Sequence, residues 1–110
     1  MIDEITLANM ADMLSIASDQ TRLKIMICLL GDEYDGSGAN EKSATPFERN
    51  VNEIVEVTGA SQSLVSHQLK ILKDADLVQA RRDGRQVFYS LSDRHVEELI
   101  QVVLEHVSEK

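Results

Sequence analysis

The most constraining feature of the chain is a pair of short helical stretches joined by a tight glycine turn. Residues 51–58 and 62–74 repeat apolar side chains at the spacing of a helix, and Thr58-Gly59-Ala60 separates them. Ser61 can cap the second helix, because its hydroxyl can accept a hydrogen bond from a backbone N–H of the first turn. Two short helices in this arrangement predict a helix-turn-helix.

A β-hairpin is expected directly after the second helix. Asp83-Gly84, a dipeptide that tolerates the positive φ angles of a tight turn, lies between β-prone residues 77–82 and 86–91. A helix-turn-helix followed by such a hairpin forms a winged helix. The predicted fold is therefore mainly α with a β-hairpin wing, a winged helix-turn-helix in the order α-α-α-α-β-β-α.

Helices are also expected on both sides of this unit. Residues 2–17 and about 20–30 carry apolar faces, and a last helix spans 93–109. The connection 32–50 is polar and acidic. Its nineteen residues are long for a compact domain, so it is either mobile or functional, with a solvated loop as the default. At 110 residues the chain predicts one winged-helix domain whose terminal helices serve dimerisation.

The helix at about 20–30 contains the only cysteine of the chain and ends at Gly31. The residues expected on its buried face are Leu23, Met26, Ile27 and Leu30. Cys28 lies inside this apolar run, so a buried structural thiol is favoured over a ligand or a nucleophile. A single cysteine excludes an intramolecular disulfide and suits a reducing cytoplasm. No apolar run approaches the roughly 20 residues of a membrane span, and no signal pattern opens the chain, so we expect a cytoplasmic protein with no membrane partner.

The charge is unevenly distributed along the chain. The formal net charge is −8, which by itself argues against nucleic acid. Residues 61–90, however, hold five basic and three acidic side chains, a net +2, so the remaining residues carry −10. A local positive face on an acidic body can still bind phosphate, with an affinity that depends strongly on salt. Double-stranded DNA therefore stays a candidate partner.

The second helix and the hairpin predict a DNA-binding surface. Its candidate residues are Ser61, Gln62, Ser63, Ser66, His67 and Lys70 on the helix and its cap, and Arg81, Arg82 and Arg85 on the wing. In the major groove, Gln62 could pair with adenine edges, the serines with phosphates or bases, and His67 or Lys70 with phosphate or guanine. The wing arginines suit phosphate or minor-groove contacts. The alternative for each residue is an ordinary solvated side chain, and the order of the elements is the stronger signal.

The last helix carries two of the three histidines at an informative spacing. His95 and His106 are eleven residues apart, close to three helical turns, so they share one side of the helix beside its apolar stripe. Asp93 precedes the first histidine and Glu109 follows the second. The two ends are roughly 16 Å apart, whereas zinc–ligand bonds are about 2.0–2.2 Å, so one ion cannot contact both histidines of one helix.

A second, antiparallel copy of this helix would complete the coordination. Asp93 and His95 of one chain would meet His106 and Glu109 of the other, twice by symmetry, with the apolar stripe as the dimer seam. Judged from this helix alone, a surface histidine pair on an ordinary amphipathic interface helix is the favoured alternative.

Three segments of the chain resemble the ArsR/SmtB family of metal-sensing transcriptional repressors. They are Asp19–Ile25, Ala60–Lys73 and the wing from Gly84 to Leu91, and the resemblance covers nearly the whole chain. The terminal pattern Asp-x-His, ten residues, His-x-x-Glu also resembles that of members with a metal site on the last helix. This resemblance favours the metal-site interpretation over the surface histidine pair.

The resemblance implies a homodimer, held by its first and last helices, that binds operator DNA without metal and is released when metal enters two symmetric sites. The ligands carried over are Asp93 and His95 from one protomer and His106 and Glu109 from the other. This donor set favours Zn(II), with Co(II) or Ni(II) as alternatives. A second class of family site uses a Cys-x-Cys pair before the recognition helix. It is absent here, because residues 52–57 contain no cysteine.

Two rival hypotheses follow from the same residues. A winged-helix repressor of the same fold could respond to a non-metal ligand, and zinc titration would distinguish it. A zinc enzyme is disfavoured, because the chain lacks His-Glu-x-x-His and four protein ligands leave no open position for water. We therefore expect a protein that is not an enzyme and takes no small organic substrate.

Overall fold

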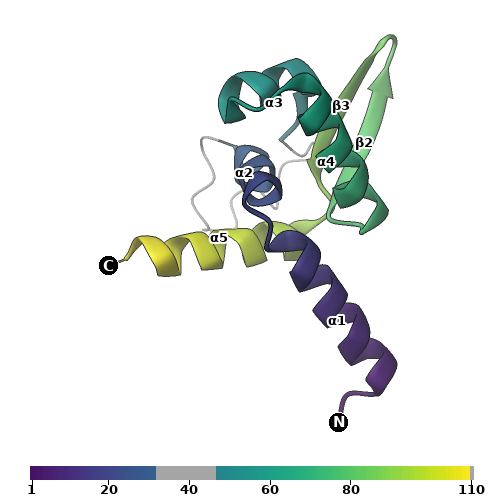
Figure 1. Cartoon of the computed structure of the whole chain (residues 1–110), viewed down its shortest axis with the longest axis vertical. Coiled ribbons are helices and arrows are strands. Elements are labelled where there is room, and N and C mark those ends of the chain that lie inside the picture. The colour runs from purple at the N-terminus through teal and green to yellow at the C-terminus, as the bar shows by residue number, and fades with distance from the viewer. Residues whose placement is uncertain (32–46, 110) are drawn as a thin grey trace.

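The computed structural model describes residues 1–31 and 47–109, which form five helices and a three-stranded sheet (Figure 1). In chain order the elements are α1 (Glu4–Ala17), α2 (Gln20–Cys28), β1 (Arg49–Asn50), α3 (Val51–Thr58), α4 (Gln62–Asp74), β2 (Val78–Asp83), β3 (Gln86–Leu91) and α5 (Arg94–Ser108). The predicted winged helix-turn-helix is confirmed, with α3 and α4 as the helix-turn-helix and β2 and β3 as the wing.

The core surrounds α2, which packs against α3, α4 and α5 (Figure 1). Its side chains without exposed surface include Ile25, Met26, Ile54, Val65, Leu69, Leu72 and Leu77. Cys28 is buried, as predicted. The prediction was wrong at Ile27, which is 39% exposed, while Ile25 is buried. Because α2 is covered by α5 as well as by the helix-turn-helix, its buried side is rotated from the one that spacing alone suggested.

Hydrogen bonds at the helix ends fix the glycine turn that the sequence predicted. Asn50 and Glu53 form a capping box at the start of α3, in which each side chain accepts a hydrogen bond from the backbone N–H of the other at 2.9 Å. Gly59 ends α3 in the left-handed conformation, with φ +75°. Ser61 Oγ then accepts a hydrogen bond from the Leu64 N–H at 3.2 Å and begins α4.

The C-terminal end of α4 is a Schellman motif with an aspartate in the position where glycine is usual. The Leu77 N–H donates to the Leu72 carbonyl at 2.9 Å, and the Asp76 N–H donates to the Lys73 carbonyl at 3.0 Å. Asp76 has φ +60°, a left-handed conformation that is unfavourable for residues with a Cβ. The fully buried Leu72 and Leu77 hold this turn on the core.

Replacing Asp76 by glycine is expected to raise the free energy of unfolding by about 0.5 kcal/mol. The left-handed conformation costs an L residue roughly 1–2 kcal/mol, and glycine's larger backbone entropy loss offsets roughly 0.5–1 kcal/mol of that relief. Urea unfolding measures the change. Asp74→Gly is the matched control, because residue 74 is helical, and it should lower the free energy by up to about 1 kcal/mol. A loss for both variants would contradict strain at Asp76.

The turn of the wing lies one residue later than the sequence predicted. β2 and β3 pair antiparallel with Asp83 opposite Gln86, so Gly84 and Arg85 form the two-residue turn. Gly84 has φ +63° at the first turn position, which is where a type II′ turn requires glycine. Asp83, which was predicted to lie in the turn, therefore ends β2.

A short third strand joins the wing and was not predicted. β1 pairs antiparallel with β3, with Arg49 opposite Tyr89, and the sheet order is β1-β3-β2. A two-residue strand has no alternation of polar and apolar side chains to reveal it. It occupies the end of the connection predicted over 32–50. The rest of that connection, residues 32–46, lies outside the described residues.

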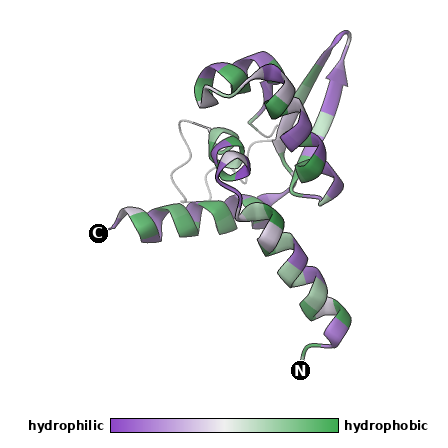
Figure 2. Ribbon diagram, in the orientation of Figure 1, coloured by the Kyte–Doolittle hydropathy of each residue, from purple (hydrophilic) through white to green (hydrophobic). Residues whose placement is uncertain are grey.

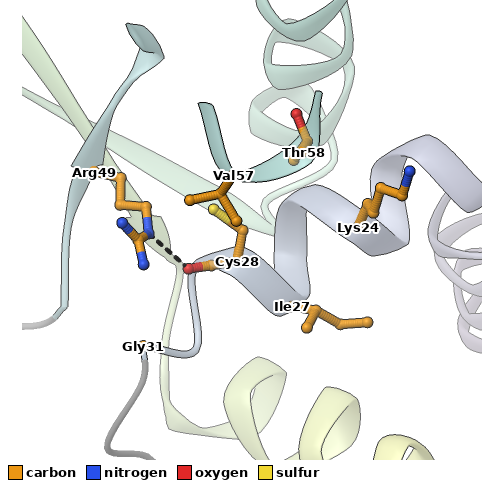
Figure 3. Close-up of a pocket in the computed structure, with 7 residues that line it drawn as sticks. All are labelled: Lys24, Ile27, Cys28, Gly31, Arg49, Val57 and Thr58. Carbon is orange, nitrogen blue, oxygen red and sulfur yellow. Dashed lines mark hydrogen bonds between the residues drawn. The ribbon is translucent and has the colours of Figure 1, made fainter. Parts of the chain in front are cut away.

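The two stretches that flank residues 32–46 are held against each other. Gly31 has φ +86°, and a Cβ built there would lie 2.9 Å from the Phe47 ring. Arg49 Nε donates to the Cys28 carbonyl at 3.0 Å (Figure 3), and the Arg49 guanidinium lies 4.9 Å from the centre of the Phe47 ring. A pocket of about 410 Å³ lies beside this junction, lined by the residues labelled in Figure 3.

Candidate nucleic-acid interface and metal-ligand pairs

One side of α4 is buried and the other presents the predicted DNA-contacting residues. Val65, Leu69 and Leu72 anchor the helix on the core. The opposite side chains are all exposed: Gln62, Ser63, Ser66, His67 and Lys70. The structure therefore places these residues on one face of a single rigid helix, where they could enter a major groove together.

Three of the candidates on α4 and its cap, Ser61, Ser63 and Lys70, also have intramolecular partners, and the hydroxyls of Ser61 and Ser63 lie 3.4 Å apart. The Ser61 hydroxyl caps α4, so its contribution to the surface is partly structural. Lys70 Nζ lies 3.5 Å from Asp74 Oδ2, and both side chains are largely exposed. An exposed pair one helical turn apart is weak, so Lys70 can exchange this carboxylate for a phosphate at little cost.

The wing separates its three arginines into two groups. Arg82 and Arg85 are exposed near the tip of the hairpin, which projects from the body of the molecule (Figure 1). Arg81 instead pairs with Glu48, with Arg81 Nε 2.9 Å from one carboxylate oxygen and a terminal nitrogen 2.8 Å from the other. Its guanidinium also lies 5.1 Å from the centre of the Phe88 ring. A phosphate would have to compete with Glu48 for the Arg81 guanidinium.

The Glu48–Arg81 pair was missed because Glu48 belongs to the stretch predicted as a solvated loop. Only 13% of the Glu48 side chain is exposed. The hydrogen bonds that Arg81 donates to the Glu48 carboxylate lower the pKa of Glu48 and raise the pKa of Arg81. The pair connects Glu48, directly before β1, to Arg81 in β2 and so stabilises the wing.

Glu48→Gln is expected to lower the free energy of unfolding at neutral pH and to have little effect in acid. Because the folded-state pKa of Glu48 lies below its ordinary 4.5, the pair stabilises the fold above that pH and loses this contribution as the pH falls through the lowered value. Urea unfolding of both proteins between about pH 7 and pH 3 measures the difference. Glu56→Gln, on the exposed side of α3, is the control. A difference that persists in acid would exclude an ionic contribution.

The structure brings two of the four predicted metal ligands together at the start of α5. Asp93 is the N-cap, and its Oδ1 accepts a hydrogen bond from the Val96 N–H at 3.0 Å. His95 Nδ1 lies 3.8 Å from the same oxygen, and the His95 side chain is 90% exposed. One imidazole and one carboxylate are thus adjacent and open to solvent.

The other two predicted ligands lie at the far end of α5. His106 and Glu109 are both exposed, in the last turn and at the C-cap. Within residues 1–31 and 47–109 of one chain, no three His, Cys, Asp or Glu side chains are grouped closely enough to hold a metal ion. Each end of α5 therefore presents a pair of donors and neither end presents a complete site.

Two further acidic residues, Glu97 and Glu98, follow the Asp93 and His95 pair on α5. Glu97 lies one turn into α5 and is half-buried. Burial raises the pKa of its carboxyl, and the negative charges of Asp93 and Glu98 raise it further. Arg94 pairs with Glu98 at 3.0 Å, which offsets part of this charge. No local sequence pattern marks Glu97, because its burial depends on tertiary packing.

Both terminal helices leave an apolar face uncovered. On α5, Val96 and Ile100 are buried in the core, whereas Leu99, Val102, Val103 and Val107 are exposed. On α1, the exposed apolar residues are Ile5, Leu7, Met10, Met13 and Leu14. Figure 2 shows hydrophobic residues along the length of both helices. Contiguous apolar surface of this kind marks an interaction site.

The fold and the exposed face of α4 define a winged helix-turn-helix protein of the DNA-binding class. A family model described as "Bacterial regulatory protein, arsR family" matches residues 47–80. The chain thus carries an ArsR-family helix-turn-helix domain, and members of this family are DNA-binding transcriptional regulators, not enzymes. None of the helices over the described ranges has the length and apolar character needed to cross a membrane.

Curated relatives match long parts of the chain. The transcriptional repressor SmtB homolog of Synechocystis sp. is 36% identical over 100 residues, covering 91% of this chain and 64% of the relative. The regulator NmtR of Mycobacterium tuberculosis is 43% identical over 56 residues, covering 51% of this chain and 47% of the relative. The chain therefore spans about half to two thirds of the length of these relatives.

Solved structures agree with the fold. The homodimeric winged helix-turn-helix DNA-binding domain Mb0332 from Mycobacterium bovis, a possible ArsR-family regulator, gives a TM-score of 0.76 at 26% identity and covers 96% of this chain and 83% of that chain. The solution structure of apo-NmtR gives a TM-score of 0.74 at 29% identity and covers 100% of this chain and 80% of that chain.

Proposed function

We propose that this protein is a metal-responsive transcriptional repressor. Its homodimer binds operator DNA without metal and releases it when Zn(II), or Co(II) or Ni(II), binds at intersubunit sites between the α5 helices. The observation that carries the proposal is the pair of incomplete donor sets at the two ends of α5, beside an uncovered apolar face. The relatives named as SmtB-type repressors and the homodimeric solved domain support it.

A second copy of the chain accounts for both the apolar faces and the incomplete donor sets. Packing two α5 helices antiparallel removes Val103 and Val107 from water in each copy, and α1 extends the same interface. The same arrangement brings Asp93 and His95 of one protomer next to His106 and Glu109 of the partner subunit. By two-fold symmetry the dimer has two such sites.

The donor chemistry fits a borderline divalent cation. Two imidazoles and two carboxylates provide four ligands of the kind that zinc accepts in tetrahedral sites, without the thiolates that soft ions prefer. When bound, the ion would supply bonds that hold the two α5 helices in one relative orientation. The exposed position of all four side chains allows them to be reached from solvent.

A short connection links the start of α5 to the end of α4, which in this proposal is the recognition helix. The Ser92 N–H, directly before the Asp93 cap, donates to the Leu77 carbonyl at 3.1 Å. Leu77 in turn completes the Schellman motif of α4. A shift of the α5 N-terminus would therefore displace the end of α4. For release, the ion must favour the dimer geometry that fits DNA poorly, commonly by about 1–3 kcal/mol.

Zinc titration of the purified dimer tests the proposal directly. We expect uptake of two ions per dimer, and a weaker affinity for operator DNA in the loaded protein. DNA binding without any stoichiometric zinc uptake would instead favour a repressor of the same fold that responds to a non-metal ligand. The pocket beside Gly31 and Cys28 is then the place to search for that ligand.

A further inference from the structure

A single arginine joins three helices of the molecule. Arg22, in α2, is half-buried, and its Nε donates to the Ile16 carbonyl of α1 at 2.7 Å. A terminal guanidinium nitrogen of the same side chain donates to Gln68 Oε1 of α4 at 2.8 Å. The Arg22 backbone N–H donates to the Asp19 cap at 3.0 Å. The planar guanidinium thus donates hydrogen bonds to α1 and to α4, while the Asp19 cap holds the start of α2.

The hydrogen bond from Arg22 to α1 provides a donor for the Ile16 carbonyl, which has no hydrogen-bond partner within the helix. Ile16 lies in the last turn of α1, where backbone carbonyls have no partner within the helix. No basic residue occupies that turn, so the Arg22 side chain supplies the cation that the negative end of the helix favours. Arg22 therefore fixes the position of the α1 C-terminus relative to α2.

The bond to α4 lies at the border between its buried and exposed sides. Gln68 is half-buried, between the exposed His67 and the fully buried Leu69. The apolar side sets how deeply α4 lies on the core, but apolar contacts are not directional. A hydrogen bond from a guanidinium is directional, so it restricts rotation of α4 about its own axis. That rotation decides where Ser66 and His67 point.

We propose that Arg22 is a positioning residue that couples the orientation of α1 to the rotation of α4, and thereby sets DNA affinity without touching DNA. This inference rests on the proposed function, in which α1 belongs to the dimer interface and α4 is the recognition helix. A change in the packing of α1 against its partner is transmitted through Ile16, Arg22 and Gln68 to the face that reads DNA.

A double-mutant cycle on metal-free protein tests the coupling. The variants are Arg22→Lys, which keeps the charge but loses the planar fork, Gln68→Met, which removes the acceptor but leaves the bond to α1, and their combination. The probe is a duplex enriched by the wild-type protein from a randomised DNA pool. Its dissociation constant is measured over a range of salt concentrations. Lys24→Arg is the matched control, because Lys24 is an exposed cation on the same helix as Arg22 and the substitution also keeps the charge.

We expect each single variant to bind the duplex about 10-fold more weakly, the double variant to bind no more weakly than Arg22→Lys, and Lys24→Arg to match the wild type. The salt dependence should be unchanged in all of them, since no phosphate contact is lost. Wild-type affinity in Arg22→Lys, losses that multiply in the double variant, or a salt slope reduced by about one would overturn the inference.

Two further outcomes are decisive. If Arg22→Lys does not fold, Gln68→Met decides alone, because it leaves the α1 bond intact, and wild-type affinity in that variant overturns the inference. Failure of the wild-type protein to enrich any duplex overturns the proposed function itself, and this inference with it. If the wild-type protein binds the duplex but the losses of affinity in the two single variants multiply in the double variant, the proposed function stands and only the role of Arg22 is excluded.

Discussion

His106→Ala is expected to leave DNA binding by the metal-free dimer intact and to abolish its release by zinc. His106 lies in the exposed last turn of α5, so its loss leaves the recognition helix and the core unchanged. It supplies one of two imidazoles at each proposed site, and two carboxylates with one imidazole make a weaker zinc site. Zinc should weaken operator binding of the wild type by about 5–150-fold and that of the variant by less than about 2-fold.

The third histidine provides the contrast for this experiment. His67→Ala should weaken operator binding, because His67 lies on the exposed face of α4, but should leave zinc uptake at two ions per dimer. Zinc uptake is followed by calorimetry and DNA binding by fluorescence anisotropy, with both variants in the same buffer. Full zinc-induced release in His106→Ala would rule out the intersubunit site proposed here.

Val103→Glu is expected to convert the dimer into monomers and to lower operator affinity by more than about 100-fold. Val103 is 49% exposed on the apolar face of α5. At an antiparallel seam each introduced carboxylate would be removed from water without a cation to pair with it, which costs several kcal/mol. A monomer contacts only one half-site, so it loses the contribution of the second recognition helix. Sedimentation equilibrium measures the dimer, and the operator assay measures the affinity.

The same substitution at another exposed valine controls for the added charge. Val57 is 54% exposed on α3, away from the proposed seam, so Val57→Glu should stay dimeric. If Val103→Glu were as dimeric as the wild type, α5 could not form the interface. If both variants became monomeric, the added charge rather than its position would be responsible.

Local patterns predicted the elements that carry their own signals. Gly59 with the Ser61 cap marked the turn between α3 and α4, and apolar spacing gave the bounds of α3 and α4. The spacing of His95 and His106, with the acids beside them, predicted a set of four ligands. The structure brings two of these, Asp93 and His95, together. Whether the two pairs combine depends on a second chain, which neither the sequence nor one chain's structure contains.

Contacts between distant segments could not be predicted in the same way. Arg22 and Gln68 are 46 residues apart, and Arg81 and Glu48 are 33 residues apart, so no periodicity links them. The pairing of Arg81 with Glu48 was missed for this reason. The left-handed conformation of Asp76 likewise follows from where Leu77 enters the core, so no local pattern marks it.

The junction of Gly31 with Phe47 has a consequence for the path of the chain. Since the Phe47 ring covers Gly31 and Arg49 fastens the Cys28 carbonyl, the entry and exit points of residues 32–46 are set by contacts outside that stretch. For a segment whose two ends are held in place, the entropy of closure changes only slowly with the number of residues. We therefore expect the two flanks, and not the number of residues between them, to fix where the chain leaves and rejoins the core.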